Sequence, residues 1–475
     1  MLFQSWQYLV LLITTILCVS FIKNTTAKKI LVLAFSIFFY AYGALWQTIL
    51  FVAVIGLAYL AGRMLDKSKN RALFIAWMVV LFLPLLFYKY VPFVLSMIPG
   101  VDEVAFQNAF LLPIGISFYT FQAVGYVIDV YRGDYSSERD LLNFACFISF
   151  FPQLVAGPIE RYDNLFDQIR HMRRPSYEML QNGFRHILLG LCLKLLVAET
   201  MAAFVDPVYN HLDNKSGLAV IIATLCFGIQ IYCDFNGYTQ IAIGSARMMG
   251  INLMQNFNHP YTASSIADFW RRWHISLTTW FRDYLYIPLG GNRKGKFRTS
   301  LNSVITFLVS GIWHGANWTF ALWGLANGVG MAIEKTYWKK LSQHRWLKMG
   351  YAVVVFVCIN LFWVFFRANS VEDAFLCYEL MFSRLIPDTL TLSASSVLDF
   401  FLHGNGWSIN DFVPAGVSVL IYVWYEYGFG KKCNLTACME STKVWVRWAT
   451  YAVLILATLY LGKTVQQSDF VYFRF

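Results

Sequence analysis

The sequence predicts an all-α, polytopic integral membrane protein with about ten to twelve transmembrane or re-entrant helices around a central tunnel. Of its 475 residues, 58% are hydrophobic and only 14% are charged, whereas soluble domains carry about 25% charged residues. Aromatic residues make up 18% of the chain, and they suit lipid-facing surfaces, interfacial belts and the walls of an apolar tunnel. Because no internal repeat or soluble domain interrupts this pattern, we expect one membrane domain over residues 1–475.

Apolar windows divide the chain into candidate spans, each near the roughly 20 residues that a spanning helix needs. They lie near residues 6–22, 30–45, 48–62, 72–88, 109–130, 140–157, 185–205, 217–243, 301–333, 349–366, 414–428 and 444–462. Basic residues follow the first window (Lys23 to Lys29) and the third (Arg63 to Arg71), and the turn at 41–47 between them is uncharged. The positive-inside rule therefore places the N-terminus outside and these two loops in the cytoplasm.

Three regions do not fit simple up-and-down crossing. The window 140–157 has basic residues on both flanks, such as Arg139 and Arg161, so it either dips in and returns or lies flat. Residues 264–298 interleave basic and aromatic side chains, a pattern typical of an amphipathic segment at the cytoplasmic face. The window 301–333 would be about 50 Å long as one helix, against about 30 Å of hydrocarbon. It must tilt or break, and Gly311 and Gly315 mark the expected break.

The formal charge of +11 does not indicate nucleic-acid binding, because the basic residues fall in short loops between apolar windows. The nine cysteines are scattered and indicate neither disulfides nor zinc, so no metal site is expected. The sequence lacks a phosphate-cradling Walker loop, a dinucleotide fingerprint, a Gly-x-Ser-x-Gly elbow and a His-Glu-x-x-His motif. We therefore expect no bound cofactor.

His314 is the strongest candidate for chemistry, because it lies inside an apolar window. An unpaired polar group in hydrocarbon costs several kcal/mol, so such histidines usually face a cavity, a partner or a substrate. A neutral imidazole there can take a proton from an acceptor hydroxyl and return it to a leaving group. Trp313 and Asn317 flank it, and Asn317 shares a helix face with His314 if the turn stays helical. The alternative is a histidine that only bonds neighbouring helices.

His274 is the second candidate, beside Arg271 and Arg272. Two arginines disfavour protonation of the imidazole and could bind the phosphates of a cytoplasmic donor. An interfacial basic and aromatic anchor explains the same pattern equally well. Asp234 is the third, a carboxylate within an apolar window that either orients a histidine or pairs with an arginine. Structural support is the favoured role for Asp234.

Five segments carry a family resemblance in the same order along the chain. They are Leu112-Pro113-Ile114-Gly115-Ile116-Ser117-Phe118-Tyr119-Thr120-Phe121, Phe151-Pro152-Gln153-Leu154-Val155-Ala156-Gly157-Pro158-Ile159, Tyr232-Cys233-Asp234-Phe235-Asn236-Gly237-Tyr238, Asp268-Phe269-Trp270-Arg271-Arg272-Trp273-His274-Ile275-Ser276-Leu277 with its continuation Phe281-Arg282-Asp283-Tyr284-Leu285-Tyr286-Ile287-Pro288-Leu289-Gly290-Gly291-Asn292-Arg293, and Gly311-Ile312-Trp313-His314-Gly315. The chain resembles the membrane-bound O-acyltransferases, and within them the bacterial alginate O-acetyltransferases. The similarity extends from about residue 30 to the terminal Tyr472-Phe473-Arg474-Phe475.

The resemblance implies a multi-pass enzyme of the bacterial cytoplasmic (inner) membrane. It implies that an acyl group, most simply acetyl, passes from a cytoplasmic thioester to an acceptor on the other face. The donor would be acetyl-coenzyme A or an acyl carrier protein, as a substrate. The acceptor would be an extracytoplasmic polysaccharide such as alginate, cellulose, peptidoglycan or another exopolysaccharide. His314 corresponds to the family's catalytic histidine and His274 to its second histidine, and an extracytoplasmic SGNH-type protein is the implied partner.

Three alternatives remain open at this point. A teichoic acid D-alanyl transferase, fed by a carrier protein, shares the His274 and His314 motifs. A proton-coupled transporter or lipid-linked sugar flippase would use the buried histidine and Asp234 as a proton relay. A non-catalytic scaffold for a polysaccharide synthase would keep full activity without His314.

Overall fold

The computed structural model describes residues 3–43, 45–100, 110–154, 157–213, 215–341, 344–385, 407–428, 442–464 and 470. The described residues contain helices and connecting segments but no β-strand, which confirms the all-α prediction. The terminal Tyr472 to Phe475 lie outside the described residues. By their contacts the chain forms two compact units, residues 1–189 with 238–256 and residues 190–237 with 257–475.

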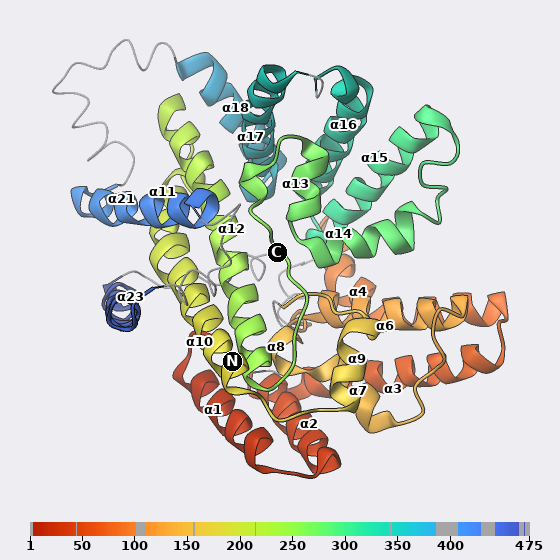
Figure 1. Cartoon of the computed structure of the whole chain (residues 1–475). Coiled ribbons are helices and arrows are strands. Elements are labelled where there is room, and N and C mark those ends of the chain that lie inside the picture. Colours follow the sequence, from red (N-terminus) through yellow and green to blue (C-terminus); the bar gives the residue numbers. More distant parts are fainter. Residues whose placement is uncertain are drawn as a thin grey trace. The chain divides into compact units, whose positions relative to one another are not determined.

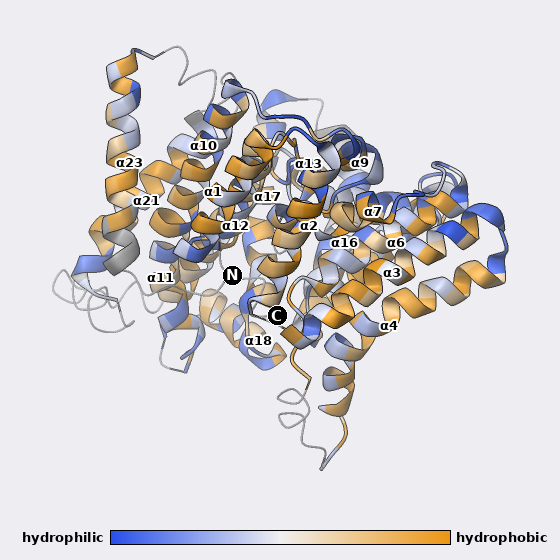
Figure 2. Cartoon of the chain, turned by 90° about the horizontal axis from the view of Figure 1, so that it is seen from below, coloured by the Kyte–Doolittle hydropathy of each residue, from blue (hydrophilic) through white to orange (hydrophobic). Residues whose placement is uncertain are grey.

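The first unit is a set of apolar helices joined by short polar loops. Its helices are α1 (Trp6–Phe21), α2 (Thr25–Ala41), α3 (Leu45–Lys67), α4 (Arg71–Leu95), α6 (Ile116–Arg132), α7 (Leu141–Ser149), α8 (Phe151–Leu154), α9 (Tyr162–Arg170) and most of α10 (Tyr177–Leu191), with the end of α12 (Gly217–Met248). Polar side chains begin several of them: Ser5, Asn24 and Asn70 each accept a backbone N–H of the following helix. Hydrophilic residues gather in the loop between α3 and α4 (Figure 2).

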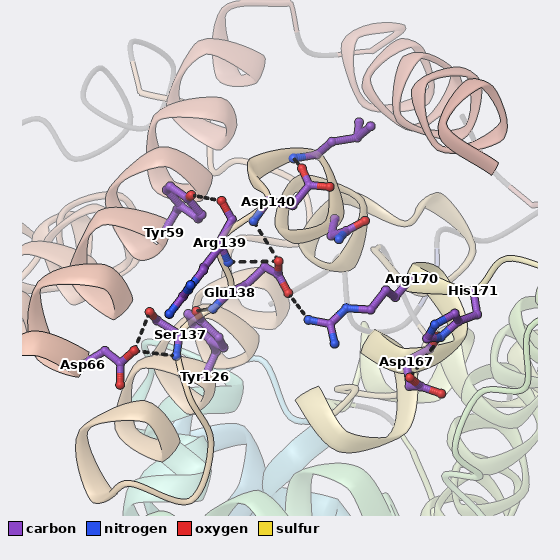
Figure 3. Close-up of polar contacts among 12 residues, drawn as sticks. Tyr59, Asp66, Tyr126, Ser137, Glu138, Arg139, Asp140, Asp167, Arg170 and His171 are labelled. Atoms are coloured by element: carbon purple, nitrogen blue, oxygen red, sulfur yellow. Dashed lines mark hydrogen bonds and ion pairs between the residues drawn. The ribbon is translucent and has the colours of Figure 1, made fainter. Parts of the chain in front are cut away.

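The window 140–157 does not form a helix long enough to span a membrane, in agreement with its basic flanks. It forms α7, of nine residues, and the four-residue α8, and both are far shorter than the roughly 20 residues of a spanning helix. The residues on its two sides also meet, because Arg170 Nη2 lies 2.7 Å from the carboxylate of Glu138 (Figure 3). The two flanks of this segment therefore lie close together.

Glu138 organises the segment that leads into α7. The buried carboxylate of Glu138 accepts hydrogen bonds from the backbone N–H groups of Arg139 and Asp140, at 2.9 and 2.7 Å. The backbone N–H of Glu138 donates to the Tyr126 hydroxyl (Figure 3). The neighbouring Ser137 is held by Asp66 through both its backbone N–H and its hydroxyl. This anchored loop keeps α6 and α7 in their antiparallel arrangement.

The second unit carries the helices of the candidate site. They are the π-helical turn η1 (Cys192–Ala198), α11 (Glu199–Tyr209), the first part of α12, the 3₁₀ turn η2 (Pro260–Thr262), α13 (Ile266–Arg272), α14 (Ile275–Phe281), η3 (Arg282–Tyr286), α15 (Gly295–His314), α16 (Trp318–Leu341), α17 (Arg345–Arg367), α18 (Val371–Glu379), η4 (Leu380–Arg384), α21 (Ile409–Val423), η5 (Trp424–Gly428) and α23 (Val444–Thr464). Residues 264–298 form short helices and turns, in agreement with the prediction that they do not span.

The window 301–333 breaks at Gly315, one of the two positions expected. Helix α15 ends at His314, Gly315 is extended, and α16 begins at Trp318. Gly311 lies within α15 instead, where it lets the two helices pack closely: a Cβ at this position would overlap the backbone oxygen of Phe320. Figure 1 shows α15 and α16 as neighbouring antiparallel helices.

Within the part of the chain that the structure describes, five helical segments are long and apolar enough to cross a membrane. They are Leu45–Lys67, Arg71–Leu95, Tyr177–Tyr209, Gly217–Met248 and Arg345–Arg367. In the third of these, α10, η1 and α11 run on without interruption through a π-helical turn. Together with the shorter apolar helices, they agree with a polytopic membrane protein.

Candidate active site

His274 and His314 lie together in the second unit. Their ring centroids are 6.4 Å apart, and both side chains are buried, with 1% and 6% of the residue exposed. Forty residues separate them in the sequence, so the fold brings together the two histidines that the sequence singled out. Both line one cavity of about 390 Å³, bounded by residues of α13, α14, η3, α15 and α16.

The position of His314 follows from the end of α15. The helix stops at this residue because Gly315 turns to extended backbone, and a Cβ at Gly315 would overlap the ring of Phe320. The imidazole lies among aromatic rings, with the Trp323 and Phe366 centroids 5.1 and 5.5 Å away. These rings restrict its orientation and keep water from its apolar sides.

His274 has an unusual backbone. It begins α14 with φ of 42°, in the left-handed region that side chains other than glycine seldom adopt. Such strain persists only where the surroundings enforce it, and it is concentrated at functional sites. The ring packs edge-on against Phe235 at 4.7 Å. Burial lowers the pKa of His274 to about 3, so this imidazole is neutral near pH 7.

Helix α13 is held in place by a carboxylate of another helix. Glu334 of α16 is buried and accepts the backbone N–H groups of Ile266 and Ala267 at 2.6 and 3.0 Å. These are first-turn donors without intrahelical partners, and a negative charge at a helix N-terminus is favourable. Since α13 ends directly before Trp273 and His274, Glu334 indirectly positions the second histidine.

The wall of the cavity combines cationic, polar and apolar side chains. Along α15 it is lined by Ser303, Thr306, Phe307, Ser310 and His314, whose spacing of three and four residues describes one helix face. Its cations are Arg271, Arg282 and Lys335. Lys335 donates to the hydroxyls of Ser303 and Tyr286 at 2.8 and 3.3 Å. Lys335 was not among the predicted site residues, because nothing in the neighbouring sequence distinguishes it from other lysines at a helix end.

Arg271 and Arg272, both predicted to bind the donor, differ in position. Arg271 lines the cavity, and its side chain is 73% exposed beside Asp268. Arg272 is absent from the cavity wall and pairs with Asp268 at 3.0 Å while it donates to Thr262. Arg271 can therefore contact a ligand in the cavity, whereas Arg272 links α13 to the preceding loop through Thr262.

The other three predicted residues, Trp313, Asn317 and Asp234, are not among those that line this cavity. Trp313 is buried against His314, with 5.0 Å between ring centroids. Asn317 does not share a helix face with His314, because α15 ends first; its side chain accepts the backbone N–H of Thr319 at the start of α16. Asp234 is buried in α12. It forms an ion pair at 2.8 Å with Lys194, which also contacts Glu199 at 2.7 Å.

No cluster of three or more potential metal-ligating side chains occurs among the described residues. The arrangement instead suits acid–base chemistry inside a mostly apolar pocket, with cations where an anionic ligand would approach.

A comparison with protein families settles the class to which this site belongs. Residues 135–372, which include both histidines and every cation of the cavity, match the model of the membrane-bound O-acyltransferase family. The chain belongs to this family. The family resemblance, the polytopic all-α fold and the prediction of an acyltransferase are thereby confirmed.

Individual relatives extend the match beyond that range. The probable alginate O-acetylase AlgI of Pseudomonas putida is 38% identical over 100% of both chains. The peptidoglycan O-acetyltransferase of Helicobacter pylori is 32% identical over 75% of this chain and 74% of the relative. The teichoic acid D-alanyltransferase of Streptococcus thermophilus is 28% identical over 71% of this chain and 82% of the relative.

Proposed function

We propose that this acyltransferase moves an acetyl group from a cytoplasmic thioester to the extracytoplasmic face of the bacterial inner membrane, for O-acetylation of a polysaccharide. The observation that carries the proposal is the pair of histidines in one cavity whose wall also carries Arg271, Arg282 and Lys335. The 38% sequence identity to a probable alginate O-acetylase, over the whole chain, supports acetyl as the acyl group. Alginate, cellulose, peptidoglycan or another exopolysaccharide are the candidate polymers.

The cations that line the cavity suit the donor. Acetyl-coenzyme A and the phosphopantetheine of an acyl carrier both carry phosphate, and Arg271 and Lys335 are the available cations nearest to the cavity. Arg282 contributes less free charge, because Asp283 pairs with it at 2.7 Å. The apolar wall of Trp270, Leu277 and Phe281 then receives the thioester arm.

His314 acts as the general base. Its imidazole takes the proton of an acceptor hydroxyl while the hydroxyl oxygen bonds to the thioester carbonyl carbon. When the carbon–sulfur bond breaks, the same proton passes to the departing sulfur, so neither proton nor charge accumulates. Neutral His274, 6.4 Å away, would donate a hydrogen bond to the carbonyl oxygen as negative charge develops on it. The aromatic walls exclude water and limit wasteful hydrolysis of the thioester.

The proposal also covers the domain organisation, the orientation of the N-terminus and the partner protein. The whole of residues 1–475 acts as one membrane domain with the N-terminus outside. An SGNH-type protein on the outer face is the proposed partner, and neither a bound cofactor nor a metal is needed for the steps above.

The test uses purified full-length protein in lipid nanodiscs with the partner present and acetyl-coenzyme A labelled in the acetyl group. We expect thioester cleavage that falls at least a hundredfold in His314→Ala, the scale at which general acid–base catalysis contributes. Absence of histidine-dependent cleavage would refute the acetyltransferase proposal. Activity only with an alanylated carrier protein would assign the chain to D-alanyl transfer instead.

A further inference from the structure

Four serine and threonine side chains line the cavity of the two histidines, and the hydroxyl of one of them is not used by the protein itself. Thr278, Ser303 and Thr306 each donate to a nearby backbone carbonyl, at 3.2, 3.0 and 2.7 Å. A serine within a helix can bond in the same way to the carbonyl one turn before it. Ser310 does not: among the described residues, none forms a hydrogen bond with its hydroxyl.

The Ser310 hydroxyl is also accessible from the cavity. Ser310 lines the cavity and is 9% exposed, and its oxygen is not one of the unpartnered side-chain atoms that are shut off from solvent. Trp270 differs in this respect, because it lines the same cavity but its indole N–H is enclosed. A ligand in the cavity can therefore reach the oxygen of Ser310 and use its unspent hydrogen-bonding capacity.

Ser310 lies on α15 between a cation and the proposed base. It precedes His314 by one turn, so the two side chains are neighbours on one helix face, with Cβ atoms about 5–6 Å apart. Nearer the start of α15, Ser303 accepts a hydrogen bond from Lys335 at 2.8 Å. The axial separation of Ser303 and His314 is about 17 Å at 1.5 Å per residue. An extended donor with its phosphate at Lys335 thus brings its thioester to Ser310 and His314.

We propose that Ser310 binds the thioester carbonyl: its hydroxyl donates a hydrogen bond to the carbonyl oxygen of the acyl group, beside the bond from neutral His274. The inference rests on the proposed function and adds a catalytic residue to it. The hydrogen bond strengthens as negative charge develops on this oxygen during attack by the acceptor hydroxyl. The proton of Ser310 stays on Oγ throughout, and no covalent bond forms to that oxygen.

Two donor analogues that are not cleaved isolate this hydrogen bond in the full-length protein in lipid nanodiscs. One is the amide analogue of acetyl-coenzyme A, in which N–H replaces sulfur and the carbonyl remains. The other is S-ethyl-coenzyme A, in which a methylene replaces the carbonyl. We expect Ser310→Ala to raise the Kd of the amide analogue about fivefold, the scale of one hydrogen bond. The Kd of S-ethyl-coenzyme A should stay unchanged.

Turnover should respond more strongly than binding, because the hydrogen bond strengthens in the transition state. Ser310→Ala should lower kcat for His314-dependent thiol release about a hundredfold, as removal of one such donor does. Ser310→Cys keeps the size of the side chain but offers only a weak donor, so it should fall between Ser310→Ala and the wild type in both measurements.

The matched control is Thr299→Val on the same helix. The Thr299 hydroxyl donates to the backbone oxygen of Gly295 at 2.8 Å, and Thr299 does not line the cavity. This variant removes a hydroxyl of α15 without touching the proposed contact. It should keep the wild-type kcat and both wild-type Kd values.

The remaining outcomes contradict the inference. Equal weakening of the two analogues in Ser310→Ala and Ser310→Cys would show that Ser310 only shapes the cavity. Wild-type kcat and Kd values in both variants, an equal effect of Thr299→Val, or an acetyl ester on Ser310 found by mass spectrometry would each overturn it as well. A wild-type protein without His314-dependent thiol release would instead refute the acetyltransferase proposal, so the two failures are distinguishable.

Discussion

At the scale of single residues, two adjacent arginines have different environments. Arg271 reaches the cavity of the two histidines, whereas Arg272 is engaged by Asp268 and Thr262. We predict that Arg271→Ala raises the KM for acetyl-coenzyme A about tenfold, because it removes a charge-assisted contact to phosphate. Arg272→Ala should leave this KM unchanged and lower the melting temperature. Steady-state kinetics and a melting curve of both variants separate these effects, and equal KM increases would contradict the assignment.

His274 should make the protein's stability dependent on pH. Burial lowers the pKa of His274 to about 3, below the ordinary value of 6.5. Below pH 6.5 the unfolded chain therefore binds a proton that the folded chain does not, and stability falls by about 1.4 kcal/mol for each pH unit toward pH 3. Between pH 7.5 and 5, His274→Asn should lose less thermal stability than the wild type. Identical losses in the two proteins would show that His274 does not contribute.

For these residues, the sequence indicated which side chains belong to the site better than it indicated the contacts that each side chain makes. The cost of a histidine in an apolar window was sufficient to select His314, since that cost does not depend on the rest of the fold. The difference between Arg271 and Arg272 depends on which side of a seven-residue helix faces the cavity. Lys335 enters the site from α16 through tertiary packing alone, and no local pattern marks it.

At the scale of helices, the ion-paired cluster of Lys194, Glu199 and Asp234 joins η1 to α12. In a π-helical turn residues five apart lie on the same side, which brings Glu199 next to Lys194. Gly237 allows the close approach, because a Cβ there would lie 2.8 Å from the Gly190 oxygen and 3.0 Å from the Lys194 nitrogen. A structural role was predicted for Asp234, and its ion pair with Lys194 is a contact that the sequence did not indicate.

We predict that Lys194→Met destabilises the protein by about 3–5 kcal/mol, because it leaves two carboxylates buried without their cation. The double variant Lys194→Met with Asp234→Asn should recover part of that loss, since one uncompensated charge is removed. Thermal unfolding of both in detergent measures the difference. If Lys194→Met unfolds like the wild type, the cluster does not stabilise this helix pair.

The break between α15 and α16 was predictable, but its location was not settled by the sequence. Gly311 and Gly315 are equivalent as signals. Packing distinguishes them: Gly311 permits a close helix crossing, whereas extended Gly315 lies beside the Phe320 ring and ends the helix at His314. The position of His314 at a helix end, on the wall of the cavity that it shares with His274, could be seen only in the tertiary structure.

At the scale of the whole molecule, membrane topology follows from the charged loops and from the segment α7–α8. The contact between Arg170 and Glu138 brings the two flanks of this segment close together, and their basic residues predict the cytoplasm. We predict that Asp134→Cys and Arg174→Cys react with an impermeant maleimide only in inverted vesicles. Gly43→Cys, in the uncharged turn after α2, should react in intact cells, above the background of native cysteines. Opposite labelling of positions 134 and 174 would contradict the arrangement.

The central claim is that His314 is the reaction centre for acetyl transfer across the membrane. The most direct measurement is the acetyl content of the exopolysaccharides and peptidoglycan from the native host carrying His314→Ala. Immunoblotting of membranes verifies that variant and wild type are present in equal amounts. The account predicts that the acetyl content of one glycan falls to the level of a deletion strain. Wild-type acetylation of every glycan in the His314→Ala strain would contradict it.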